Sequence, residues 1–195
     1  MNDANTSFVK TWRRFLIEVE LAKNYPRPYL LYTMQTHRNP LLEYLLPSLL
    51  YVKMVSILDE ALSTYIDEQN LILPKKHKNS LQNKVDFLTD KNILHNSEVL
   101  HDIRETRNAL AHNTTKQVGW DELKHDLSEI QTTFEQLTLT DMRPKYEFFA
   151  ERSAMKGSTE AGVSATQDFS YGLKEGNRVV VEVTWTEKLL EDEQE

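Results

Sequence analysis

Hydrophobic positions recur at helical spacing through the first two thirds of the chain and alternate with polar positions near its end. Five segments show the helical pattern and are expected to form helices: residues 5–24, 41–68, 80–90, 96–112 and 120–137. The segment 41–68 is apolar around nearly its whole circumference, which is typical of a helix at the centre of a bundle. Pro47 in this segment is expected either to kink the helix or to set its start at Ser48.

A β-hairpin is expected near the C-terminus. Alternating apolar and polar residues run through 169–173 and again through 179–185, with a glycine-containing turn between them. Residues 146–149 are a candidate third strand. The expected fold is therefore mainly α, with a helical bundle over residues 1–140. A β-rich appendage over residues 141–195, a β-hairpin or small β-meander with an acidic tail, is expected to follow it.

Composition narrows the possible functions. The chain has 195 residues, 39% of them hydrophobic, a net charge of −7 and no cysteine. The absence of cysteine excludes disulfides and thiolate sites. The negative net charge argues against a protein that coats nucleic acid through its overall charge. A local basic site stays possible. We expect no cofactor and no metal, because no pair of histidines has the spacing of metal ligands. No signal peptide or membrane span is evident, so a soluble cytoplasmic protein is expected.

Two charged residues stand in apolar helix faces. Arg107 lies in the middle of the apolar face of segment 96–112, and a buried guanidinium requires an acceptor. The neighbours of Arg107 on that face are Leu100, Ile103, Leu110 and Ala111. Asp59 lies in an apolar stripe of segment 41–68 in the same way. We therefore predict that Arg107 and Asp59 form a buried or half-buried ion pair.

Polar groups gather beside Arg107. Arg104, Asn108 and His112 are successive i+4 neighbours, so they form one stripe along the helix. Arg107 and His112 are five residues apart, about 140° around a regular helix. Their side chains can converge if that of Arg107 bends around the helix, if the last helical turn unwinds, or if His112 faces Arg107 of a second copy. Asn113 suits a left-handed position at the helix end.

A basic loop follows the central helix. Lys75, Lys76 and Lys78 lie close together in it. The loop is either a solvated connection or a patch that binds RNA phosphates near the Arg107 cluster.

The segment from Arg107 to His112 resembles the signature of the HEPN superfamily, an arginine followed by a polar residue and, after four to six positions, a histidine. The helical order over residues 5–138 resembles that family as well, whereas the β-rich part does not. The resemblance implies a helical bundle that forms a homodimer and brings two signature helices to one cleft. Many members are metal-independent endoribonucleases in toxin–antitoxin, phage-defence and CRISPR-associated systems. Others are non-catalytic binding or assembly modules, and some have a nucleotidyltransferase antitoxin as partner.

The cluster contains the groups that metal-free RNA cleavage needs. Under this hypothesis His112 is the general base or acid, Arg107 stabilises phosphate charge and Asn108 positions the phosphate or the imidazole. Arg104 and Asp59 are supporting residues, and the products carry 2′,3′-cyclic phosphate ends. The alternative is a non-catalytic HEPN-like module acting with a partner protein. In that case Arg107 only neutralises Asp59, and His112 is a helix-end histidine favoured by the helix dipole.

Overall fold

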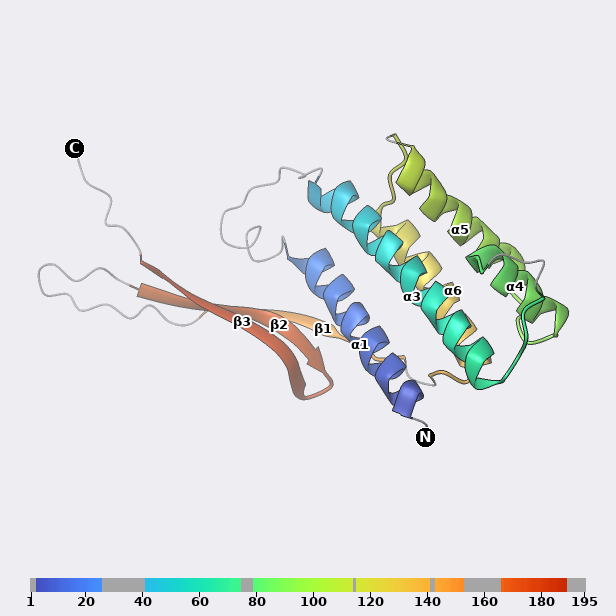
Figure 1. Cartoon of the computed structure of the whole chain (residues 1–195). Coiled ribbons are helices and arrows are strands. Elements are labelled where there is room, and N and C mark those ends of the chain that lie inside the picture. The colour runs from blue at the N-terminus through green and yellow to red at the C-terminus, as the bar shows by residue number, and fades with distance from the viewer. Residues whose placement is uncertain are drawn as a thin grey trace, which may run out of the picture. The chain divides into compact units, whose positions relative to one another are not determined.

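The computed structural model describes residues 3–25, 41–74, 79–113, 115–140, 143–152 and 166–188. Over these residues the protein is mainly helical, with a three-stranded antiparallel sheet towards the C-terminus (Figure 1). The helices are α1 (Asp3–Asn24), η1 (Leu41–Leu45), α3 (Leu46–Glu68), α4 (Leu81–Asp90), α5 (Ser97–His112) and α6 (Trp120–Gln136). The strands are β1 (Glu147–Arg152), β2 (Thr166–Glu175) and β3 (Arg178–Lys188).

The chain divides into two compact units. The first comprises residues 1–19 and 37–143, and the second residues 20–36 and 144–195. The first unit is the helical bundle, and the second contains the sheet. The hydrophobic pattern did not predict that the end of α1, from Glu20 onward, is grouped with the second unit.

Helix α3 is the centre of the bundle. It contacts α4, α5 and α6, and Lys53 on α3 pairs with Glu18 on α1. A π-helical turn, η1, leads directly into α3, and Pro47 stands in the first turn of the α-helical part. A proline is tolerated there because its missing N–H would have no helical partner. The helix therefore begins before Ser48.

The segment Leu41–Glu68 is the one helix among the described residues with the length and composition of a membrane span. It has 28 residues and a window of mean hydropathy 1.6. The core helix of a water-soluble bundle has the same properties. Ten residues of α3 are buried, which accounts for its apolar sequence within the bundle.

An aromatic cluster joins α1 to α6. The ring of Phe134 on α6 makes edge contacts with Phe8 and Trp12 of α1, at centroid distances of 4.9 and 4.8 Å. The buried indole N–H of Trp12 donates a hydrogen bond to Gln131 Oε1. The amphipathic pattern of segment 5–24 thus corresponds to a real packing face.

The second unit contains a sheet in the order β1-β2-β3, and both pairs are antiparallel. Gly176 turns the chain between β2 and β3 with a φ of +58°. Phe169 and Leu173 are buried in this unit, and the ring of Trp185 stacks on Phe169 at 5.2 Å. The predicted hairpin and third strand are confirmed.

Candidate functional site

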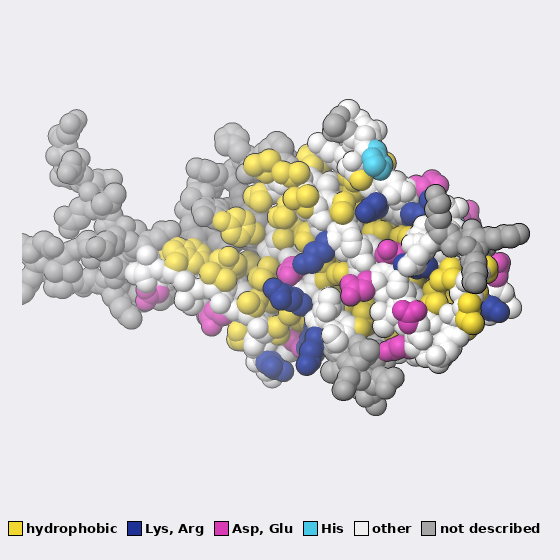
Figure 2. Space-filling model, in the orientation of Figure 1, with side chains coloured by type: hydrophobic (Ala, Val, Ile, Leu, Met, Phe, Trp, Pro, Cys, Tyr) yellow, Lys and Arg dark blue, Asp and Glu magenta, His cyan; other side chains and the backbone are white. Residues whose placement is uncertain are grey.

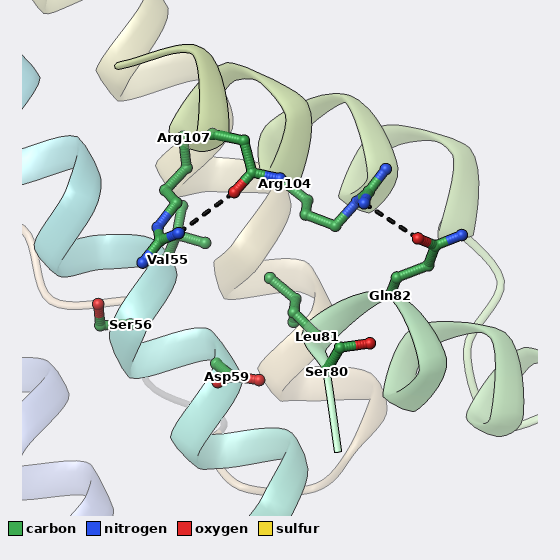
Figure 3. Close-up of a pocket in the computed structure, with 9 residues that line it drawn as sticks. Val55, Ser56, Asp59, Ser80, Leu81, Gln82, Arg104 and Arg107 are labelled. Atoms are coloured by element: carbon green, nitrogen blue, oxygen red, sulfur yellow. Dashed lines mark hydrogen bonds between the residues drawn. The ribbon is translucent and has the colours of Figure 1, made fainter. Parts of the chain in front are cut away.

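A pocket of about 330 Å³ opens between α3, α5 and the beginning of α4. Figure 3 shows arginine side chains of α5 along one wall and residues of α3 opposite them. The residues that line the pocket are Val55, Ser56, Asp59, Ser80, Leu81, Gln82, Arg104, Arg107 and Asn108. Four of the candidate site residues, Asp59, Arg104, Arg107 and Asn108, thus meet at one cavity within the helical unit.

Arg107 extends from α5 towards α3. Its side chain is half-buried, and Nη1 donates a hydrogen bond of 3.2 Å to Oδ1 of Asn108. In Figure 3 its guanidinium lies beside Val55 and Ser56 of α3. A guanidinium has five N–H donors, and this contact uses one of them. The remaining donors and the full positive charge are therefore available to an anion in the pocket.

The predicted ion pair between Arg107 and Asp59 is wrong. Asp59 instead pairs with Lys84 of α4, at 2.8 Å between Oδ1 and Nζ. The lysine side chain is 4% exposed and also donates to Ser63 Oγ at 2.6 Å. Lys84 reaches α3 because it lies on the buried face of α4, next to Val85. The carboxylate is thus neutralised by a cation that does not line the pocket.

Arg104 occupies the other end of the same wall. Its Nη1 donates to Gln82 Oε1 at 3.0 Å, and its Nη2 lies 3.1 Å from Glu105 Oε1. Nε of Arg104 is buried and has no hydrogen-bond partner in the described part of the chain. Glu105 is 69% exposed, so water weakens its attraction for the guanidinium. Glu105 therefore offsets only part of the positive potential that Arg104 contributes at the pocket wall.

These contacts make the pocket electropositive in an acidic protein. Arg104 and Arg107 contribute two positive charges to the lining, and the charge of Asp59 is balanced by Lys84. The net charge of the chain is −7. The cavity is therefore suited to bind an anion, although the net negative charge of the whole chain would not attract one.

His112 lies outside the pocket. It is the last residue of α5, is exposed, and does not line the cavity. In the described part of the chain it makes no hydrogen bond or ion pair. The helix stays regular to this residue, so the last turn does not unwind to bring His112 to Arg107. Arg107 does not reach round the helix to His112 either, because its side chain is directed towards α3 (Figure 3). Within one chain, therefore, neither bending of Arg107 nor unwinding of the last turn brings the two side chains together.

The end of α5 differs from expectation at Asn113. This residue has extended rather than left-handed backbone, with φ −118° and ψ 111°. Its side-chain oxygen accepts hydrogen bonds from the backbone N–H and the hydroxyl of Thr115, at 3.0 and 2.7 Å. This local side-chain contact stabilises an alternative to the left-handed helix end.

A partly buried pair joins α3 to α6. The Tyr51 hydroxyl donates a hydrogen bond of 2.5 Å to Oδ2 of Asp126 on α6. Burial, and then the neighbouring Asp126, raise the pKa of Tyr51. Burial also raises the pKa of Asp126, and the hydrogen bond from Tyr51 opposes that shift. This hydrogen bond links α3 to α6, and neither of its residues lines the pocket.

The structure does not describe the predicted RNA-binding lysines. Lys75, Lys76 and Lys78 lie outside the described residues, so their proximity to Arg107 stays a prediction. Within the described ranges, no group of three or more His, Asp and Glu side chains is arranged to hold a metal ion.

Comparisons with models of protein families, with curated protein sequences and with solved structures found no match for this chain. The site must therefore be interpreted from its own geometry. That geometry is a pair of arginines and an amide at a pocket, with an exposed imidazole on the same helix.

Proposed function

We propose that this protein is a metal-independent endoribonuclease of the HEPN kind that works as a homodimer in the cytoplasm. The observation that carries the proposal is the composition of the pocket: Arg107 and Asn108 line it together, and its carboxylate, Asp59, is already paired with Lys84. A planar guanidinium with free donors is suited to two oxygens of one phosphate. The amide N–H₂ of Asn108 is a further donor, since its oxygen is occupied by Arg107.

The proposal assigns proton transfer to His112 of a second copy. The side chain of His112 is exposed, and an imidazole can both accept and donate a proton, which suits general acid–base catalysis. Arg107 of the same chain is directed towards α3 (Figure 3), and His112 does not line the pocket. A two-fold dimer places each His112 near the pocket of the other chain if α5 lies at the dimer axis.

The reaction follows from these groups. The imidazole of His112 removes the proton of a ribose 2′-hydroxyl, whose oxygen then attacks the adjacent phosphorus. The bond from phosphorus to the 5′-oxygen breaks, and that oxygen takes up a proton. Arg107 stabilises the negative charge that builds up on the phosphoryl oxygens. The products are a 2′,3′-cyclic phosphate and a free 5′-hydroxyl.

An apolar surface beside the pocket supports dimerisation. Leu45 and Leu49 are 50% and 59% exposed, and Leu41 before them is 60% exposed. Their spacing continues along α3 through Val52 to Ser56 in the pocket wall. Figure 2 shows hydrophobic side chains gathered over the beginning of α3. Exposed large apolar side chains in one row favour a protein contact.

Purified protein, single-stranded RNA and EDTA test the proposal. We expect cleavage with 2′,3′-cyclic phosphate ends, and a loss of at least about 100-fold in rate for His112→Ala. His95→Ala is the matched control, because His95 is also exposed but precedes α5. The proposal fails if the parent protein leaves RNA intact, or if His112→Ala and His95→Ala cleave equally.

The apolar row also favours a second candidate, a non-catalytic module that assembles with another protein such as an antitoxin. The observation behind it is the same exposure of Leu41, Leu45 and Leu49. Under this alternative, complex formation responds to substitutions in that row and not to His112→Ala. A stable complex without any RNA cleavage would favour the module.

A further inference from the structure

We infer that the pocket binds two successive phosphates of a single RNA strand, one at Arg107 and the next at Arg104. This inference rests on the proposed function only for the choice of RNA as the polyanion. The residue that it adds to the site is Arg104, supported by Gln82.

The two guanidinium groups do not converge. Figure 3 shows the Arg107 guanidinium beside Ser56 on α3, whereas the Arg104 guanidinium lies near Gln82 on α4. Arg107 is held in its direction by a hydrogen bond to Asn108 at 3.2 Å. Arg104 is held by hydrogen bonds to Gln82 at 3.0 Å and to Glu105 at 3.1 Å. A single phosphate between them would require both side chains to leave these partners. Two anionic groups, one for each arginine, require no such rearrangement.

The spacing of the two arginines suits a nucleic acid backbone. Residues three apart on a helix have Cβ atoms about 5–6 Å apart, and diverging side chains separate their charged ends further. Successive phosphates of an RNA strand are separated by a comparable distance. The cavity volume of about 330 Å³ also exceeds what one phosphate fills.

The charges around Arg104 leave it open to an anion. Its acidic neighbour Glu105 is 69% exposed, and Gln82 is a neutral acceptor. The Arg104 side chain is 22% exposed, so it is held at the wall and still reaches the cavity. Leu81 and Gln82 belong to the first turn of α4, and the dipole at that helix end adds a partial charge of the same sign.

Salt dependence of RNA binding tests the inference. The probe is a fluorescent single-stranded RNA of about 12 nucleotides with 2′-O-methyl riboses, which binds but cannot be cleaved. Each phosphate contact to a single strand contributes about −0.7 to the slope of log affinity against log salt. We expect Arg104→Gln to weaken binding and to reduce the slope by about 0.7, as Arg107→Gln does, and the double variant to reduce it by about 1.4.

Three further variants test whether RNA binding depends on the charge of Arg104, on its contact with Gln82, or on the loss of any surface arginine. Arg104→Lys keeps the cation and should keep the slope. Gln82→Glu places a carboxylate on Arg104 and should weaken binding as Arg104→Gln does. Arg14→Gln removes an arginine that is 83% exposed on α1, outside the pocket, and should leave affinity and slope unchanged.

The inference is overturned if Arg104→Gln behaves like Arg14→Gln. It is also overturned if the double variant loses no more slope than either single one, since both arginines then share one phosphate. Absence of any binding to this RNA overturns it as well. Because the probe cannot be cleaved, these outcomes are independent of catalysis: natural RNA left intact with the slopes as expected would reject the endoribonuclease and retain the two-phosphate site.

Discussion

The ammonium of Lys84 lies 2.8 Å from the carboxylate of Asp59 and ties α4 to α3 beneath the pocket. Lys84 also donates to Ser63 Oγ and to the backbone oxygen of Asp59, and its side chain is almost fully buried. The pair therefore has two consequences. It stabilises the junction of the two helices, and it leaves Arg107 without a carboxylate partner among the described residues, whereas Arg104 has the exposed Glu105.

Replacing Lys84 by methionine tests the first consequence. The change removes charge-assisted hydrogen bonds while retaining much of the side-chain volume, so we expect a loss of about 2 kcal/mol in the free energy of unfolding. Urea denaturation followed by circular dichroism measures it. Lys91→Met at the exposed end of α4 is the control and should stay within about 0.5 kcal/mol of the parent. A Lys84→Met protein that is as stable as the parent would mean that the Lys84–Asp59 pair adds no stability.

The carboxyl of Asp126 predicts a particular pH dependence. Burial raises its pKa in the folded state above the usual value of 3.8, so the folded protein binds this proton more tightly than the unfolded chain. Its contribution to stability is therefore present below pH 3.8 and declines as the pH rises through the raised folded pKa. Asp126→Asn keeps an acceptor for Tyr51 and removes this titration.

Urea unfolding at several pH values checks this prediction. The stability of Asp126→Asn relative to the parent should increase as the pH rises from about 3.8 through the acidic range and then level off. A difference between the two proteins that does not change with pH would contradict the raised pKa.

Gly172 is required by close packing in the sheet. A Cβ at this position would lie 2.1 Å from the carbonyl oxygen of Val181 and 2.9 Å from the ring of Phe149. We expect Gly172→Ala to destabilise the sheet by about 1–3 kcal/mol, because backbone and ring must both move. Hydrogen exchange over residues 166–188 would report this as faster exchange.

Gly119→Ala is the matched control for Gly172→Ala. A Cβ at Gly119 meets nothing within 4 Å, so only a small loss at the beginning of α6 is expected. Unchanged exchange in the sheet of Gly172→Ala would show that the strands accommodate the methyl group.

Dimerisation through the apolar row of α3 predicts that Leu49→Glu is folded but monomeric. Leu49 is 59% exposed, so the charge costs little within one chain, yet it would be buried without a partner in the dimer. Analytical ultracentrifugation measures the change, and RNA cleavage should be lost with it. Ile72→Glu, at a residue that is 86% exposed and outside the row, should leave both unchanged. A Leu49→Glu protein that dimerises like the parent would exclude this surface.

Periodicity predicted the helices because α1, α3, α4, α5 and α6 each bury hydrophobic residues at helical spacing. It predicted the hairpin through alternation, although among the described hydrophobic residues of the hairpin only Phe169 and Leu173 of β2 are buried, and Val179 and Val183 of β3 are 45% and 40% exposed. The helices expected over 80–90 and 96–112 correspond to α4 and α5, and Ser80 provides the N-cap of α4 by accepting a hydrogen bond from the Asn83 N–H at 3.4 Å. The π-helical turn before Pro47 has no signal in the hydrophobic pattern, since its residues, apolar apart from Glu43, fit an α-helix equally well.

The partner of Asp59 was missed although a signal was present. Lys84 stands among Leu81, Val85 and Leu88 at helical spacing, so it occupies an apolar face just as Arg107 does. The sequence therefore offers two cations, Lys84 and Arg107, as partners for the one carboxylate of Asp59. Sequence cannot decide such a competition, because it depends on which helix packs closer to α3. The role of Gln82 beside Arg104 was missed for the same reason, since the contact joins residues 22 positions apart.

The most direct test of the account is a mixture of two inactive variants, Arg107→Gln and His112→Ala, assayed together on RNA in EDTA. A mixed dimer contains one site with Arg107 from one chain and His112 from the other, so random exchange should restore about a quarter of the parent activity. If each chain used its own Arg107 and His112, no site in any dimer would be complete. A mixture as inactive as its components, while the parent protein cleaves, would contradict a site shared between two copies.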